Sequence, residues 1–363
     1  MKHGDWEVKK LGEVCDILNG RNQKKVEDIN GKYPIYGSGG IMGYANDYIC
    51  KAGTTIIGRK GSINKPLYVE TEFWNVDTAF GLQPKECCHS RFLYYLCKSI
   101  DFARYDKGVT IPSLVKSDLL QIPVCIPSLE EHTRIVEELD LLSNIIEKKR
   151  QQLSELDNLA QSIFYDMFGD PVTNEKGWEV KKLGEVCKTS SGGTPSKSHS
   201  EYYEGGIIPW LRSGEVNQMY ISKTELFITE EGLANSSAKW FPENTVVIAM
   251  YGATVGQVGI LCKMMTTNQA ICGIFPNESF IPIYLYHFLL SKKEEYIKLA
   301  SGGAQPNISQ NIIRDTLVCC PKKELQQLFA QKIEAIEKQK ALIKQSIAET
   351  EELFNSRMDY YFS

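Results

Sequence analysis

The sequence predicts an α+β protein built as a pseudo-twofold internal repeat. In this plan, two homologous mixed α/β domains are separated by two long helices that pair as an antiparallel coiled coil. The decapeptide WEVKKLGEVC occurs twice without a mismatch, starting at Trp6 and again at Trp178. Each copy is followed by a β-patterned segment and then by a long stretch with heptad spacing. A repeat period of 172 residues exceeds that of solenoids and propellers, so each copy heads a whole domain.

The β-patterned and heptad-patterned stretches divide the chain into four segments. These are residues 1–126, a first domain; 127–169, a central long helix; 170–320, a second domain; and 321–363, a second long helix.

Composition limits the class of protein. The chain has 363 residues, of which 42% are hydrophobic, enough for two or three cores. It contains no run of about 20 apolar residues and no signal-peptide pattern, so we expect a cytoplasmic protein without a membrane segment. The eleven cysteines are therefore expected to be reduced and mostly buried. Their spacing includes no CxxC pair, so we expect no bound metal.

The charge is unevenly distributed. The net charge of -4 argues against a general polyanion binder. Residues 1–126 hold 17 basic and 14 acidic residues, whereas residues 127–177 hold 5 basic and 11 acidic ones. Contact with a phosphate backbone would therefore be made by local patches, with modest affinity from this chain alone.

In the first domain, short strands alternate with glycine-containing turns. The β-branched run 54–57 ends at Gly58-Arg59-Lys60-Gly61-Ser62, a turn suited to a phosphate or a base edge; the alternative is a solvated basic hairpin tip. The run 73–80 is interpreted as strand-like and mostly core, and 91–99 as a helix. A turn over 107–113 precedes the exit strand.

Both long helices carry a heptad seam. Ser128 and Glu131 have the spacing of a capping box at the start of the first helix, and Gly169 ends it. Forty residues make a rod of about 60 Å, and its seam needs a second helix to cover it. The alternative is that each helix docks on another protein. The predicted seams are Ile135, Leu139, Leu142, Ile146, Lys149, Leu153, Leu156, Ala160, Ile163 and Met167, and Phe329, Ile333, Ile336, Lys340, Ile343, Ile347, Thr350, Phe354, Arg357 and Tyr361.

The globular parts also align with each other. The aligned pairs of segments are 33–39 with 208–214, 57–62 with 249–254, 77–79 with 268–270, and 108–114 with 303–308. The frame is shared, but the polar residues at the loop tips differ. Two modules that read different base sequences require such differences, and neutral divergence also produces them.

Several of these motifs together resemble one family. The paired WEVKKLGEVC openings, GGTPSKS (192–198), IIPWLRSGEVN (207–217), TNQAICGI (267–274) and the two helix starts are similar to specificity subunits of type I restriction-modification systems. One departure is His132, which stands where a glutamine is common and where the second copy has Gln326. We interpret His132 as a helix-surface variant.

The resemblance implies two target-recognition domains, each reading one half of a split, asymmetric site in double-stranded DNA. It also implies that the subunit is not itself an enzyme. Two modification (methyltransferase) subunits would bind it, and restriction (motor-nuclease) subunits would join through them. The subunit itself would need no cofactor, and S-adenosylmethionine, ATP and Mg²⁺ would be expected only in the partner subunits.

Strand-end loops are the candidates for DNA contact, because their hydroxyl, amide and cationic side chains can bond base edges and phosphates. Arg59 or Arg212 would suit guanine, and Gln305 or Asn307 adenine. The candidates are Ser38, Arg59, Lys60, Ser62, Lys65, Lys107 and Thr110 in the first domain, and Ser196, Lys197, Arg212, Ser213, Tyr251, Thr254, Gln305 and Asn307 in the second.

The sequence also lacks the usual catalytic signatures: it has no NPPY or DPPY tetrapeptide, no Walker loop and no metal-ligand spacing. Two alternative functions remain. A solitary DNA-binding protein of the same fold is disfavoured by the modest charge. A coiled-coil scaffold that binds only proteins is disfavoured by the polar, variable loop tips.

Overall fold

The computed structural model describes residues 6–300 and 306–363. The chain forms two compact units: Met1–Gln151 with Lys344–Ser363 (unit 1), and Gln152–Ile343 (unit 2). Each unit contains one globular domain and part of both long helices, α4 (Leu129–Phe168) and α10 (Lys323–Phe362).

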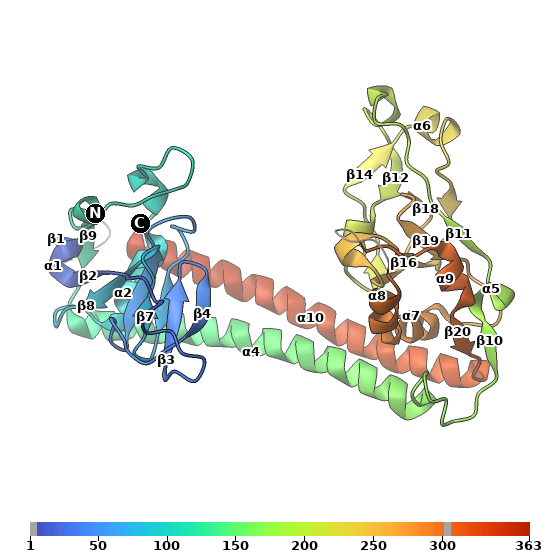
Figure 1. Ribbon diagram of the computed structural model, residues 1–363, viewed down its shortest axis with the longest axis horizontal. Coiled ribbons are helices and arrows are strands. Elements are labelled where there is room, and N and C mark those ends of the chain that lie inside the picture. The colour runs from blue at the N-terminus through green and yellow to red at the C-terminus, as the bar shows by residue number, and fades with distance from the viewer. Residues whose placement is uncertain (1–5, 301–305) are drawn as a thin grey trace. The chain divides into compact units, whose positions relative to one another are not determined.

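The globular part of unit 1 contains two sheets and a terminal strand pair. Their strand orders are β2-β8-β5-β6, β4-β3-β7 and β1-β9. The elements are β1 (Glu7–Lys10), α1 (Leu11–Val14), β2 (Cys15–Asn19), β3 (Tyr33–Gly37), β4 (Gly40–Ala45), β5 (Thr54–Gly58), β6 (Leu67–Val69), β7 (Trp74–Asn75), β8 (Ala79–Pro84), α2 (Ser90–Ser99), η1 (Phe102–Tyr105), α3 (Lys116–Leu119) and β9 (Pro123–Ile126) (Figure 1).

Unit 2 repeats this plan and adds one strand to each large sheet. Its strand orders are β11-β19-β16-β17-β13, β14-β12-β18-β15 and β10-β20. The elements are β10 (Val180–Lys182), α5 (Leu183–Val186), β11 (Thr189–Ser191), η2 (Ser200–Tyr202), β12 (Ile208–Leu211), η3 (Ser213–Glu215), β13 (Tyr220–Ile221), β14 (Leu226–Ile228), α6 (Glu230–Ala234), β15 (Trp240–Phe241), β16 (Val246–Ala249), η4 (Gly252–Thr254), β17 (Val258–Leu261), β18 (Met265–Thr267), β19 (Ile271–Ile274), α7 (Pro282–Ser291), α8 (Lys293–Leu299), α9 (Gln310–Asp315) and β20 (Leu317–Cys319). The shared strand order confirms the predicted internal repeat and fold class.

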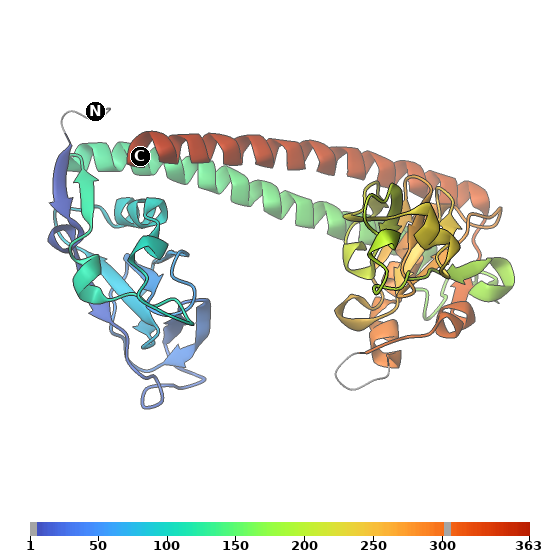
Figure 2. The ribbon, with the colours of Figure 1, turned by 90° about the horizontal axis from the view of Figure 1, so that it is seen from above.

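The two long helices pair antiparallel within each unit. In unit 1, Lys149 Nζ donates to Ser346 Oγ at 2.5 Å, and Arg357 Nη2 donates to Glu138 Oε2 at 2.9 Å. Residue numbers therefore rise along one helix as they fall along the other. In unit 2, Lys340 Nζ lies 2.7 Å from Asp157 Oδ1. Figures 1 and 2 both show α4 and α10 side by side, as the heptad spacing predicts.

The helix seams are buried as predicted. Every predicted seam position is buried or half-buried. The predicted seams do not include Phe164 and Phe168, which are buried in the core of unit 2 with Tyr284 of α7. At this end α4 contacts the globular domain as well as α10, so its apolar stripe is wider than that of a two-stranded coiled coil.

His132 is not a helix-surface residue, so that interpretation was wrong. Its side chain is fully buried and stacks on Phe92, with ring centroids 3.9 Å apart. The backbone N–H of His89, just before α2, points to His132 Nδ1 at 3.5 Å. In unit 2 the equivalent Gln326 accepts a hydrogen bond at 2.8 Å from the N–H of Ile281, just before α7. In both units this position connects the long helix to the globular domain.

The run 73–80 is mostly core, as predicted, but it is not one strand. Only Trp74–Asn75 pairs with β3, and β8 begins at Ala79. The intervening residues form a turn that lies close to the chain at Gly20. A Cβ on Gly20 would lie 1.8 Å from the Val76 carbonyl oxygen. Glycine at position 20 therefore permits the close approach that shapes the loop after β7.

Candidate nucleic-acid interface

In unit 1, the loops after three strands meet at one edge. Strands β3 and β7 are parallel, with Tyr36 opposite Asn75, so both chains leave the sheet on the same side. The loop after β7 then reaches the turn after β5. The carbonyl oxygen of Thr78 accepts hydrogen bonds from the N–H groups of Arg59 at 2.8 Å and Lys60 at 3.1 Å. Two cationic residues are thereby fixed beside the ends of β3 and β7.

A fourth segment, residues 107–113, joins the same edge. Lys60 and Ser113 form a β-bridge, and the Gly61 N–H donates to the Pro112 carbonyl oxygen at 3.0 Å. The Leu114 N–H donates to the Arg59 carbonyl oxygen at 2.9 Å. These contacts join the cationic turn to the segment that carries Lys107 and Thr110.

The candidate residues of unit 1 differ in how they are held. Arg59 is half-buried, and its guanidinium lies 3.4 Å from the Asp77 carbonyl oxygen. Lys107 is exposed, with its ammonium 3.5 Å from Asp118. Ser38, in the turn after β3, is half-buried; the remaining candidates are the exposed Lys60, Ser62, Lys65 and Thr110. Apart from Lys65, which follows the turn after β5, the candidates come from the segments that meet at this edge.

Unit 2 builds the equivalent edge from the same connections. Tyr251 and Asn307 form the β-bridge that corresponds to Lys60 and Ser113. The Gly252 N–H donates to the Pro306 carbonyl oxygen at 2.8 Å, as Gly61 does to Pro112. Tyr251, Thr254 and Asn307 therefore come together as the alignment predicts. Gln305 lies outside the described residues.

The other candidates of unit 2 have local partners. Arg212 follows β12, and its Nε donates to Glu215 Oε1 at 3.2 Å while Nη2 contacts Glu225. Two carboxylates thus neutralise this cation, and a contact from Arg212 to guanine would have to displace one of them. Thr254 Oγ1 donates to the Tyr251 carbonyl oxygen at 3.0 Å, which stabilises the turn. The other candidates are the half-buried Ser213 and the exposed Ser196 and Lys197.

Sequence reasoning missed the loop after β18. The Asn268 N–H donates to the Leu211 carbonyl oxygen at 2.9 Å, which places Asn268 and Gln269 next to Arg212. Gln269 is exposed, and its side-chain oxygen accepts a hydrogen bond from Thr194. The signal was present, because residues 268–270 align with 77–79 in the loop that fixes Arg59 and Lys60. Gln269 therefore joins the candidates of unit 2.

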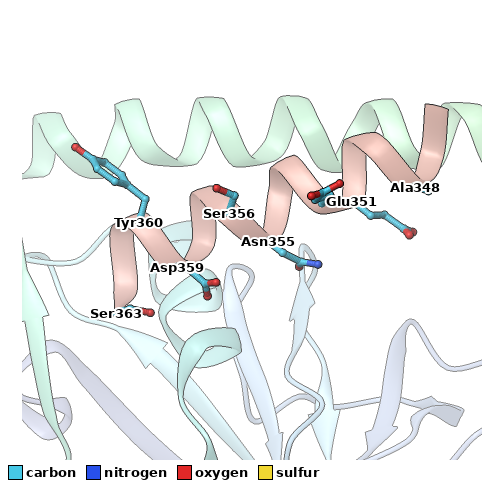
Figure 3. A pocket seen from close by; sticks show the side chains of 8 residues that line it. Ala348, Glu351, Asn355, Ser356, Asp359, Tyr360 and Ser363 are labelled. Atoms are coloured by element: carbon cyan, nitrogen blue, oxygen red, sulfur yellow. The ribbon is translucent and has the colours of Figure 1, made fainter. Parts of the chain in front are cut away.

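A surface hollow beside the C-terminal part of α10 offers a different surface. Its lining residues come from α10 and the residue that follows it, Ser363, and they include Glu351, Glu352, Asn355 and Asp359. Figure 3 shows Glu351, Asn355 and Asp359 among the side chains that line this hollow. Carboxylates repel a polyanion, so the loop edges are the better candidates for nucleic acid.

Metal and membrane features are absent from the described part of the chain. Within residues 6–300 and 306–363, no three His, Cys, Asp or Glu side chains are grouped to hold a metal ion. No helix in these ranges has the length and apolar character needed to cross a bilayer. The eleven cysteines form no disulfide in the described part of the chain, and most of them are buried.

The duplicated domains and the paired long helices define a two-domain protein with an internal repeat and one equivalent loop edge per domain. The chain belongs to the family described as the type I restriction modification DNA specificity domain, whose model matches residues 3–158 and 175–352.

Curated relatives match over most of their length. The type I restriction enzyme MjaIX specificity subunit of Methanocaldococcus jannaschii is 26% identical, over 90% of this chain and 85% of the relative. The putative type I restriction enzyme specificity subunit S.HindORF215P of Haemophilus influenzae is 24% identical, over 99% of this chain and 95% of the relative.

Solved structures share the fold. The S subunit of a type I restriction-modification system from M. genitalium superposes with a TM-score of 0.62 at 15% identity, covering 99% of this chain and 96% of that one. A chain from a study of complex assembly and conformational transition of the type I R-M system gives 0.58 at 18% identity, covering 98% and 97%.

Proposed function

We propose that the chain is the DNA sequence-specificity subunit of a type I restriction-modification complex. Each globular domain reads one half of a bipartite, asymmetric site. Recognition directs adenine methylation or restriction, which partner subunits perform. The domain in unit 1 reads its half-site with the edge around Arg59 and Lys60, and the domain in unit 2 with the edge around Tyr251, Asn307 and Gln269.

The observation that supports this function is the pair of equivalent β-bridges, Lys60 to Ser113 and Tyr251 to Asn307. The backbone connection is the same in both units, whereas the side chains that it presents differ in charge and hydrogen-bonding groups. A protein that reads two different half-sites on one scaffold needs this combination, because base edges are distinguished by donor and acceptor pattern.

The proposal assigns the chemistry to other subunits. Two modification subunits bind this chain, and restriction subunits join through them. S-adenosylmethionine, ATP and Mg²⁺ bind to those partners. The long helices are suited to hold partners, because α4 and α10 expose leucines at positions outside their seams, among them Leu141, Leu159, Leu342 and Leu353.

Replacing Arg59 and Lys60 together with alanine tests the proposed edge of unit 1. We expect the assembled methyltransferase complex to bind its cognate duplex about ten- to a hundredfold more weakly, because a cation contact to a base or phosphate is lost at each position. The slope of log affinity against log salt should fall by about 1–2. Fluorescence anisotropy with a labelled duplex measures both quantities.

Lys148→Ala is the matched control, since this lysine is exposed on α4 away from the loop edge. The single Lys60→Ala variant separates loss of DNA contact from a folding defect. Replacing the half-buried Arg59 could disturb the fold, whereas replacing the exposed Lys60 should not. Unchanged affinity and salt slope in both the double and the single variant would exclude this edge as the DNA interface.

A further inference from the structure

The loop between η1 and α3 presents apolar side chains to solvent at the edge of unit 1. Val109 is fully exposed, at 101% of its reference area, and Ile111 is 61% exposed. Thr110 between them is exposed as well. We call residues 109–111 the apolar tip. Two exposed β-branched aliphatic residues at one loop end form a small apolar surface that another molecule can cover.

The tip is held by a closed set of hydrogen bonds. One carboxylate oxygen of Asp106 accepts from the N–H groups of Gly108 and Ser113, each at 2.7 Å. The hydrogen bond from Ser113, which has the larger effect, and the one from Gly108 lower the pKa of Asp106 below its usual value. The carboxylate therefore stays charged at neutral pH. The Lys107 N–H also donates to the Ser113 carbonyl oxygen at 2.9 Å. These hydrogen bonds hold together the two ends of the loop, on either side of the apolar tip.

A close backbone approach shapes the loop further. A Cβ on Gly108 would lie 1.9 Å from the Ile111 carbonyl oxygen, so the chain folds back on itself there and only glycine fits. Val109 and Ile111 are also stiff about χ1 because they are β-branched. Such side chains present methyl groups at little entropic cost.

The surroundings of the tip indicate what covers it. Pro112 and Ser113, directly after the tip, are bonded to the turn that carries Lys60, and Lys107 lies just before the tip. An apolar tip flanked by cations matches the major groove of DNA, where phosphates border the groove. Inside the groove, the only apolar group that the base edges present is the 5-methyl of thymine.

We propose that the apolar tip reads a thymine methyl group in the half-site recognised by the domain of unit 1. This inference rests on the proposed function and adds two specificity-determining residues, Val109 and Ile111, that the candidate set did not contain. The aligned stretch of the second domain, Gly303-Ala304-Gln305, has no β-branched side chain. Recognition of a thymine methyl group by an apolar tip is therefore confined to the half-site of unit 1.

Deoxyuridine substitution provides the test, because it removes the methyl group and leaves the hydrogen-bonding edge unchanged. Duplexes with the cognate site would carry deoxyuridine in place of one thymine at a time, on either strand. We expect one position in the unit 1 half-site at which the assembled wild-type complex binds about three- to tenfold more weakly. The Val109→Ala, Ile111→Ala double variant should bind the two duplexes at that position equally.

Ile29→Ala is the matched control, since Ile29 is 91% exposed in the same unit and lies outside the loop edge. It should retain the sensitivity of the wild type. Equal binding of thymine and deoxyuridine duplexes by wild type at every position would overturn the inference. A half-site without thymine, or sensitivity that persists in the double variant, would also overturn it. Specific binding of the all-thymine duplex by wild type separates these results from a failure of the proposed function.

Discussion

Replacing Phe329 with alanine is expected to lower the free energy of unfolding of unit 2 by about 3–5 kcal/mol. Phe329 is fully buried on α10, and its ring meets those of Phe168 and His287 edge to face at 5.2 and 5.1 Å. These rings come from α10, α4 and α7, so the cavity would lie where the helix pair joins the globular domain. Urea denaturation, followed by circular dichroism, measures the loss.

The neighbouring Leu328 supplies the control for this prediction. Its side chain is 48% exposed on the same helical turn, so Leu328→Ala should change the free energy of unfolding by less than about 0.5 kcal/mol. If both variants lose the same small amount, the aromatic cluster does not hold the helix pair to the domain.

The second large effect concerns pH and His132. Burial, with a smaller contribution from His89, lowers the pKa of His132 from 6.5 to about 4. In the unfolded chain this imidazole takes up a proton as the pH falls through about 6.5, whereas in the folded chain it stays neutral until about pH 4. Stability that is present above pH 6.5 is therefore lost on acidification. The loss from this residue should reach about 2 kcal/mol at pH 5 and about 3 kcal/mol at pH 4.

His132→Gln isolates this contribution, because the equivalent position in unit 2 holds a fully buried glutamine, Gln326, whose side chain is hydrogen-bonded at both ends. The variant should match wild type within about 1 kcal/mol at pH 7.5 and should be the more stable of the two at pH 5. His287, whose pKa is also lowered to about 4 by burial, remains in both proteins and cancels in the comparison. Parallel stability curves for the two proteins between pH 7.5 and 5 would contradict the account.

The sequence predicted the helix pair well because the physical signal is local and periodic. Apolar residues such as Ile135 and Ile333 belong to series with coiled-coil spacing. The simplest way to bury a seam of that length is to pair it with the other seam of the same chain. Phe164 and Phe168 were missed because their burial depends on a domain that approaches from outside the seam. His132 was misread for the same reason, since its partner Phe92 lies on α2, far away in the sequence.

The candidate interface could be predicted only in part. The turn after β5 stands out by its composition, so Arg59 and Lys60 could be named as candidates from the sequence. Gln269 was not among the candidates, although residues 268–270 align with 77–79, because its place at the edge depends on the short parallel pairing of β12 with β18. Only two residues of each strand take part in this pairing, which is too short for a periodic signal. The exposure of Val109 and Ile111 depends on hydrogen bonds to Asp106, which propensity does not reveal.

Methylation mapping tests the central claim most directly. The chain would be coexpressed with the proposed methyltransferase subunit, and methylated adenines would be mapped across the host genome by single-molecule sequencing. We expect the methylated adenines to lie in a split motif of two short half-sites with a fixed gap. This methylation should disappear when the chain is omitted. Unchanged methylation without the chain, or the absence of any split motif despite a stable complex, would contradict the central claim.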